Sequence, residues 1–95
     1  DLADAILRAA NDIETCPELI NIGLGHDFTI NEYYSEVADV IDWQGQFTHD
    51  LTRPVGMDQK LCDIHRATEW GWSAPTSLRV GIEETYKFYC ERLVK

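Results

Sequence analysis

The stretch that decides the fold is residues 28–41, which read FTINEYYSEVADVI. Thr29, followed three residues later by Glu32, forms the capping-box pattern that opens a helix. Phe28 and Tyr33 stand where a hydrophobic staple would place them. Apolar residues then recur at the spacing of one helical face: Ile30, Tyr33, Tyr34, Val37, Ala38 and Ile41. We therefore predict a helix that buries this face and ends near residues 42–43.

Two short segments on either side of this helix are predicted to be strands. Residues 19–22 are a mostly apolar run ended by Gly23, and residues 46–49 are a weaker candidate. A strand, a helix and a strand joined by short links indicate a right-handed crossover and a parallel pair. The expected fold class is therefore α/β, with a small βαβ unit.

Three more helices are expected outside this unit. Residues 1–11 have apolar residues on one helical face and acidic residues at the N-terminal end. Asp63 is a natural cap for a helix over residues 64–70, and Gly71 is the left-handed residue expected after it. Thr76 or Ser77 then caps a last helix that reaches about Leu93. The prediction is about four helices and two parallel strands.

Length, charge and cysteine content limit the possible functions. Ninety-five residues make one domain at most, and the formal net charge is −9. Nucleic acids and anionic membranes require a basic surface, so neither is an expected partner. No apolar run approaches the roughly 18–20 residues that span a bilayer. Three widely spaced cysteines without a C-x-x-C pair indicate reduced, mostly buried thiols in a cytosolic protein.

The best candidate site is the loop over residues 50–63, which carries Arg53 and Lys60 beside a proline and a glycine. Loops that follow strands often bind ligands in α/β folds. Arginine binds phosphate oxygens through its planar fork, and lysine adds a point charge. A diphosphate would suit such a pair. The alternative is a solvated loop with two surface cations, and spacing alone does not choose between them.

Other candidate sites are weaker. The turn at residues 23–28 has two of the three glycines of a dinucleotide-binding loop, with Phe28 at the third position, so a plain turn is favoured. None of the three histidines has a metal-ligand partner at the right spacing. Cys62 and His65 are three residues apart and could touch, but a structural thiol is the better interpretation of Cys62. We assign no catalytic residue.

The ordered motifs of the chain resemble the C-terminal part of GDP-L-fucose synthase, a branch of the extended short-chain dehydrogenase/reductases. From Leu19 onward the resemblance covers nearly every segment in order, and residues 1–5 resemble the helix just upstream. The matching segments are Asn21–Gly25, Phe28–Glu32, Gly45 with Asp50, Arg53-Pro54-x-Gly56, Lys60-Leu61-x-Asp63, Trp70–Trp72 and Ser77–Ile82.

The resemblance implies that residues 1–95 form part of a substrate-binding domain. The full-length enzyme would be a cytoplasmic homodimer that epimerises GDP-4-keto-6-deoxy-mannose at two carbons and reduces its ketone with NADPH. NADP and the catalytic residues would belong to an N-terminal Rossmann domain that this chain lacks, so the chain alone would be inactive. Lys60 falls on a lysine that holds the nucleotide-sugar in the family, and Arg53 occupies a basic position beside the same pocket.

Two departures from the family pattern keep other functions open. Val55 stands where the family often has Asp, and Gln46 where it often has a basic residue. A sibling nucleotide-sugar epimerase or dehydratase therefore remains an alternative. A third hypothesis, from another class, is an acidic interaction module without a ligand.

We also expect the isolated chain to self-associate, because it would expose the face that meets the Rossmann domain.

Overall fold

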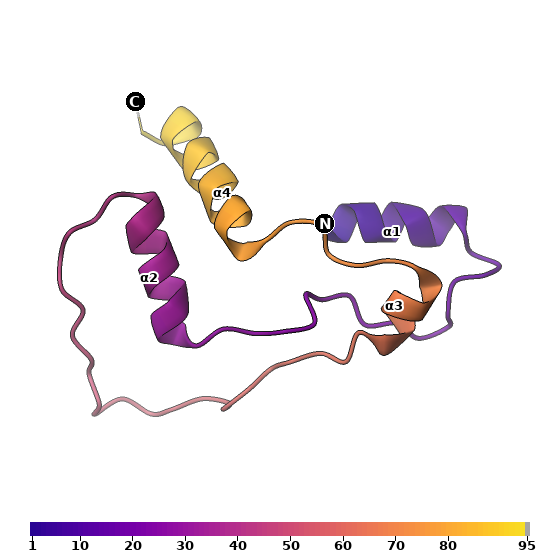
Figure 1. Ribbon diagram of the computed structural model, residues 1–95, viewed down its shortest axis with the longest axis horizontal. Coiled ribbons are helices and arrows are strands. Elements are labelled where there is room, and N and C mark those ends of the chain that lie inside the picture. The colour runs from indigo at the N-terminus through magenta and orange to yellow at the C-terminus, as the bar shows by residue number, and fades with distance from the viewer. Residues whose placement is uncertain (95) are drawn as a thin grey trace. The chain divides into compact units, whose positions relative to one another are not determined.

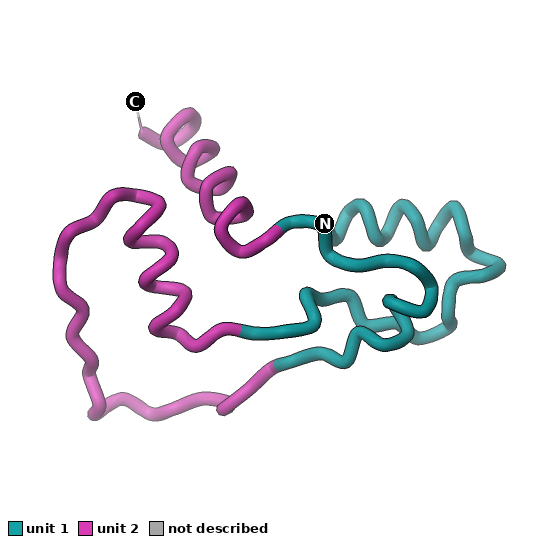
Figure 2. The backbone as a smooth tube through the Cα atoms, viewed as in Figure 1, with its two compact units in different colours: residues 1–27, 61–76 teal, residues 28–60, 77–95 magenta. Residues whose placement is uncertain are grey.

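The computed structural model describes residues 1–94, and the described part contains four α-helices (Figure 1). They are α1 (Leu2–Asn11), α2 (Ile30–Val40), α3 (His65–Trp70) and α4 (Leu78–Arg92). The chain divides into two compact units (Figure 2). Unit 1 comprises residues 1–27 and 61–76, and unit 2 comprises residues 28–60 and 77–95. Across residues 1–94, no helix has the length and apolar character needed to cross a membrane.

The four predicted helices are confirmed, but the two predicted strands are wrong for this chain. Residues 19–22 and 46–49 are neither helix nor strand, and the described part of the chain contains no β-strand. The α/β class and the parallel crossover are therefore not observed. A strand is stable only when a neighbouring strand takes up its backbone N–H and C=O groups. Residues 45–58 make no backbone–backbone hydrogen bond to any other segment of the described part.

The core of unit 1 is small and is built around Trp72. Trp72, Ala5 and Ala67 are 5%, 2% and 1% exposed, and four partly buried residues pack against them: Ile20, Ile22, Trp70 and Ala74. The Trp72 indole N–H donates a 3.3 Å hydrogen bond to the Asp4 carboxylate on α1. This bond satisfies the polar end of a side chain whose ring is otherwise buried.

Arg8 ties α1 to the end of α3 within unit 1. Its guanidinium donates to the carbonyl oxygens of Gly71 at 2.9 Å and Trp70 at 3.1 Å. The same group lies 4.7 Å from the centroid of the Trp70 ring, within cation–π range. Two carbonyl groups at the end of α3 thus accept hydrogen bonds from a cation. A positive charge is favourable at a helix C-terminus.

Of the two caps predicted for α3, the one at Gly71 is confirmed and the one at Asp63 is wrong. Gly71 has φ 96°, the left-handed conformation predicted for it. Because α3 begins one residue later than predicted, Ile64 is the N-cap residue, and Asp63 precedes it. The Asp63 carboxylate still accepts the backbone N–H of His65 at 2.9 Å. Thr76 does not cap α4; its backbone N–H and hydroxyl both donate to the Asp1 carboxylate.

Unit 2 contains α2 and α4, which pack against each other. The capping box is present: Thr29 Oγ1 accepts the Glu32 N–H at 3.1 Å, and a Glu32 carboxylate oxygen accepts the Thr29 N–H at 2.6 Å. The staple is present as well, with the Phe28 and Tyr33 rings 5.5 Å apart. Ser77 caps α4 through a 3.3 Å bond from the Val80 N–H.

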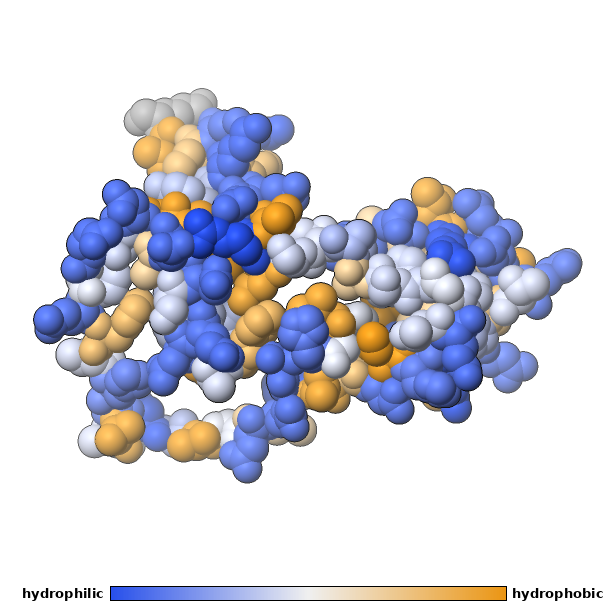
Figure 3. All heavy atoms as spheres, in the orientation of Figure 1, coloured by the Kyte–Doolittle hydropathy of each residue, from blue (hydrophilic) through white to orange (hydrophobic). Residues whose placement is uncertain are grey.

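The apolar face of α2 is not buried, contrary to the prediction. Ile30 is 68% exposed and Tyr34 is 58% exposed, and α4 likewise has no buried residue. Figure 3 shows apolar side chains at the surface of the unit that holds these helices.

The prediction that the cysteines are mostly buried also needs correction. Cys62 is exposed, and Cys16 and Cys90 are half-buried. None of the three forms a disulfide.

Candidate functional site

The loop that the sequence singles out leaves Arg53 accessible. Its side chain is 82% exposed, and its Nε donates to the Asp50 carboxylate at 3.2 Å. No other hydrogen bond of Arg53 is formed within residues 1–94, so its two terminal nitrogens can bind a ligand. Planar N–H donors of this kind match the oxygens of phosphate.

Asp50 is held in its ionised form by its neighbours. The Thr52 hydroxyl donates to Asp50 Oδ1 at 2.6 Å, and the Thr52 backbone N–H donates to the same oxygen at 3.0 Å. These bonds, with that of the Thr52 side chain the largest contribution, lower the pKa of the Asp50 carboxyl below its ordinary value of 3.8. The Arg53 hydrogen bond adds to the effect. Asp50 thus fixes one edge of the Arg53 guanidinium.

Lys60 lies at the far end of this loop in unit 2. It is exposed, and it forms no ion pair or hydrogen bond within residues 1–94. Arg53 and Lys60 share no partner residue in the described part of the chain. Their joint role in binding a diphosphate therefore stays a prediction.

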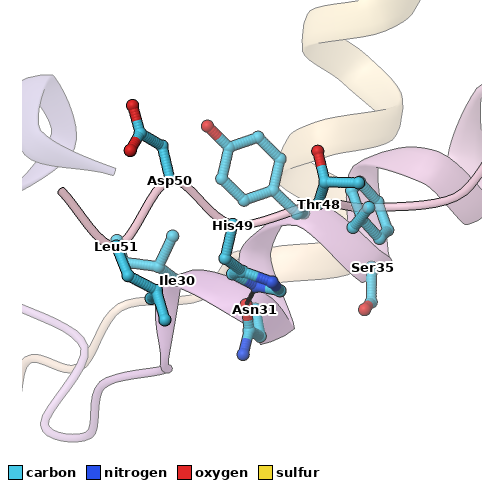
Figure 4. A pocket seen from close by; sticks show the side chains of 9 residues that line it. Ile30, Asn31, Ser35, Thr48, His49, Asp50 and Leu51 are labelled. Atoms are coloured by element: carbon cyan, nitrogen blue, oxygen red, sulfur yellow. Dashed lines mark hydrogen bonds between the residues drawn. The ribbon is translucent and has the colours of Figure 1, made fainter. Parts of the chain in front are cut away.

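A pocket that the sequence did not indicate lies beside this loop. It has a volume of about 480 Å³ and is lined by residues of α2 and of the segment that follows it: Ile30, Asn31, Tyr34, Ser35, Phe47, Thr48, His49, Asp50 and Leu51. Figure 4 shows the first turn of α2 facing residues 48–51 across it. Ligand pockets in proteins commonly have volumes of 300–1,000 Å³, so this one is large enough for a small ring.

A hydrogen bond between two side chains joins the two walls of the pocket. His49 Nε2 lies 2.8 Å from Asn31 Oδ1, and Figure 4 shows the two groups directed at each other. The donor and acceptor roles in this contact depend on the tautomer of His49. Asn31 and His49 are 18 residues apart and match no motif, so no sequence signal brings them together.

The weaker candidates of the sequence do not form sites in the described residues. Gly25 adopts φ +90°, which accounts for the glycine-rich turn without a bound nucleotide. Cys62 and His65 make no hydrogen bond to each other; instead, His65 Nε2 lies 3.2 Å from the Glu69 carboxylate one turn along α3. The pair therefore lacks the contact that nucleophilic catalysis would require.

Comparison with known proteins gives strong matches over nearly the whole chain. A GDP-L-fucose synthase from Azorhizobium caulinodans is 47% identical over 89 residues, which cover 94% of this chain and 28% of that protein. GDP-L-fucose synthase 1 from Arabidopsis thaliana is 36% identical over 93 residues, covering 98% of this chain and 28% of that protein. The chain is homologous to one part of the GDP-L-fucose synthases. The resemblance stated from the ordered motifs is confirmed.

A protein named for another product also matches the chain. A GDP-L-colitose synthase from Yersinia pseudotuberculosis is 42% identical over 89 residues, covering 94% of this chain and 29% of that protein. The chain thus spans less than a third of the length of these relatives. No protein-family model matches the chain, and no solved structure matches it significantly.

Proposed function

We propose that this chain is part of the substrate-binding domain of a GDP-L-fucose synthase-like enzyme. The full-length protein would epimerise GDP-4-keto-6-deoxy-mannose at two carbons and reduce its ketone with NADPH. The observation that carries this proposal is the 47% identity over 89 residues to a GDP-L-fucose synthase.

Arg53 and Lys60 are the proposed contacts of the substrate's diphosphate. The exposed guanidinium of Arg53, oriented by Asp50, supports this role, and so does the unpaired ammonium group of Lys60. Each cation would act as an individual donor to the diphosphate, because the loop also contains Asp50, Asp58 and Asp63 and is not positive as a whole.

The remainder of the enzyme is also part of the proposal. A Rossmann domain outside these 95 residues would bind NADP, and the complete enzyme would be a cytoplasmic homodimer. The α/β character predicted from the sequence would belong to the full-length enzyme. Residues 45–58 support this view, because no other described segment pairs with their backbone and a strand partner could bind there.

A titration of the full-length protein with GDP-mannose, UDP-glucose and dTDP-glucose would test the proposal. We expect the GDP-sugar to bind most tightly, and Lys60→Ala to raise its Kd about tenfold or more, as for loss of a hydrogen bond to a charged group. Lys87→Ala is the matched control, since Lys87 is an exposed lysine whose one ion pair is a 3.9 Å contact with Glu91. Equal Kd values for the three nucleotide-sugars would contradict the proposal.

The colitose relative supports a second candidate, a sibling enzyme that acts on another GDP-sugar. Both candidates predict a preference for GDP over UDP and dTDP. They differ in the product, so chromatography of the reaction with GDP-4-keto-6-deoxy-mannose separates them. Formation of GDP-L-fucose would select the first candidate. Tight GDP-sugar binding without this product would select the sibling.

A further inference from the structure

Residues 47–51 lie against α2 through side chains rather than through their backbone. Residues 45–58 make no backbone–backbone hydrogen bond to another described segment. Instead, His49 Nε2 lies 2.8 Å from Asn31 Oδ1 on α2, and the Phe47 and Tyr34 ring centroids are 5.8 Å apart. A ring contact restrains a segment loosely, whereas a hydrogen bond depends on both distance and direction. The His49–Asn31 contact therefore fixes the position of this part of the loop on α2.

The residue after His49 connects this contact to Arg53. The Asp50 carboxylate accepts the Arg53 Nε–H at 3.2 Å and is itself held by Thr52. In Figure 4 the side chains of His49 and Asp50 point to opposite sides of the backbone, as successive residues of an extended segment do. One side chain thus faces α2, while the other accepts from Arg53. The guanidinium is joined to α2 through two hydrogen bonds and a single peptide link.

Chain length indicates how much this contact can restrain Arg53. Arg53 is four residues beyond His49. The nearest helix ends along the chain are Val40, thirteen residues before Arg53, and His65, twelve residues after it. The effective concentration of a tethered group falls roughly as the −3/2 power of the tether length, so loss of the anchor at His49 would lower it about fivefold. Lys60 is only five residues before His65, so its position depends much less on His49.

We propose that His49 and Asn31 are positioning residues for substrate binding: their contact holds residues 49–53 on α2 and keeps the Arg53 guanidinium where it can meet a diphosphate. This inference rests on the proposed function, and it adds two residues that act through Arg53 and touch no phosphate themselves. Neither side chain needs a charge for this role, because either neutral tautomer of His49 can pair with an amide.

Isothermal titration of the full-length protein with GDP-mannose would test this role. His49→Phe keeps a ring but removes the hydrogen bond, and we expect it to raise the Kd about three- to fivefold, in line with the longer tether of Arg53. Asn31→Leu should have the same effect, and the double variant should bind no more weakly than either single variant, because both changes break one contact. His49→Gln keeps polar atoms at the end of the side chain and should restore most of the affinity. His65→Phe on α3, at an exposed histidine outside this contact, is the matched control and should leave the Kd unchanged.

Two further backgrounds separate positioning from direct contact with the ligand. In Arg53→Ala protein, His49→Phe should cause no further loss of affinity, whereas in Lys60→Ala protein it should raise the Kd by the same factor as in the wild type. An equal factor in both backgrounds would overturn the inference, because His49 would then act without Arg53. An unchanged Kd in His49→Phe, or a Kd in His49→Gln as high as in His49→Phe, would overturn it as well.

The mobility of Arg53 in the absence of ligand gives a readout that does not depend on the proposed function. We expect NMR relaxation of the Arg53 Nε to show greater picosecond-to-nanosecond motion in His49→Phe than in the wild type, and no change in His65→Phe. Unchanged Arg53 motion in His49→Phe would overturn the inference even if GDP-mannose binds. Increased motion in a protein whose wild type fails to bind GDP-mannose would instead count against the proposed function alone.

Discussion

Arg79 on α4 donates a hydrogen bond to the Asp39 carboxylate on α2, and this contact connects the two helices of unit 2. The same guanidinium bonds Glu83 at 2.8 Å and lies 3.6 Å from Glu36. The hydrogen bond to Asp39 is the main reason that the pKa of Arg79 is raised. One cation therefore contacts three carboxylates and reduces the repulsion among them.

Replacing this cation should destabilise unit 2 in a salt-dependent manner. Arg79→Met keeps most of the aliphatic stem but leaves Glu36, Asp39 and Glu83 without their counter-charge. We expect the Tm of the full-length protein to fall by a few degrees in about 20 mM salt, and by less in about 500 mM salt, because salt screens exposed charges. Lys87→Met, which removes a single weaker pair on α4, should change Tm less at both salt concentrations. A salt-independent decrease would show that packing, not charge, explains the effect.

The capping box of α2 should make a measurable contribution to stability. Thr29→Ala removes the side-chain acceptor of the Glu32 N–H, and we expect the free energy of unfolding to fall by about 1 kcal/mol. Urea denaturation followed by circular dichroism would measure this change. Thr29→Ser retains the hydroxyl and should recover most of the loss. If Thr29→Ser and Thr29→Ala were equally destabilised, the methyl group of Thr29 would be the important part.

Trp72 should be the most costly single side chain to remove in unit 1. It is 5% exposed and makes a hydrogen bond to Asp4, so Trp72→Ala leaves both a cavity and an unpaired carboxylate. Core substitutions of this kind cost about 3–5 kcal/mol. Trp43, at 44% exposure, is the matched control, and Trp43→Ala should cost clearly less by the same urea measurement. Equal losses would mean that Trp43 is buried in the full-length protein.

The acid titration of Asp50 should depend on Thr52. The pKa of Asp50 is lowered, so the contribution of its hydrogen bonds is present above pH 3.8 and is lost as the pH falls through the folded-state pKa. In Thr52→Val the hydroxyl is absent, and the pKa of Asp50 should rise toward 3.8. An NMR titration of the Asp50 side-chain carbon between about pH 2 and 6 would follow this shift. An unchanged midpoint would mean that Arg53 and the backbone N–H hold the carboxylate without the hydroxyl.

Gly56 offers a way to stiffen the proposed diphosphate loop without adding a contact. A Cβ placed on Gly56 meets no atom within 4 Å, so Gly56→Ala should be accommodated. Alanine restricts the backbone more than glycine does, which should tighten GDP-mannose binding about two- to fivefold. Val55→Ala, at the neighbouring exposed position, should not change the Kd. Weaker binding in Gly56→Ala would indicate that the bound loop needs a conformation open only to glycine.

The sequence was most informative where the structure depends on neighbouring residues. The capping box at Thr29, the left-handed Gly71 and the Ser77 cap all follow from contacts within a few residues, and all were predicted. The strands were not predictable in this way, because pairing depends on a distant segment. Helical periodicity likewise identified the apolar face of α2, but it could not show that this face is exposed in the described part of the chain.

The candidate sites likewise differ in whether they depend on neighbouring or on distant residues. Arg53 and Lys60 could be selected because rare cations in an acidic chain, placed in a loop with proline and glycine, are visible in the sequence. The pocket could not be found, because its central contact joins residues 18 positions apart that follow no motif. Asn31 appeared in the sequence only as part of a helix, and His49 only as the end of a predicted strand.

The backbone of residues 45–58 forms no hydrogen bond to the backbone of another segment, which has a thermodynamic consequence for the proposed diphosphate site. Arg53 lies within this segment and Lys60 lies two residues beyond it. A ligand that contacts both must therefore order the residues between them. Fixing a backbone costs about 1–2 kcal/mol of conformational entropy per residue. Calorimetry should therefore record a favourable binding enthalpy offset by an unfavourable entropy, and the amide hydrogens of this segment should exchange more slowly when the ligand is bound.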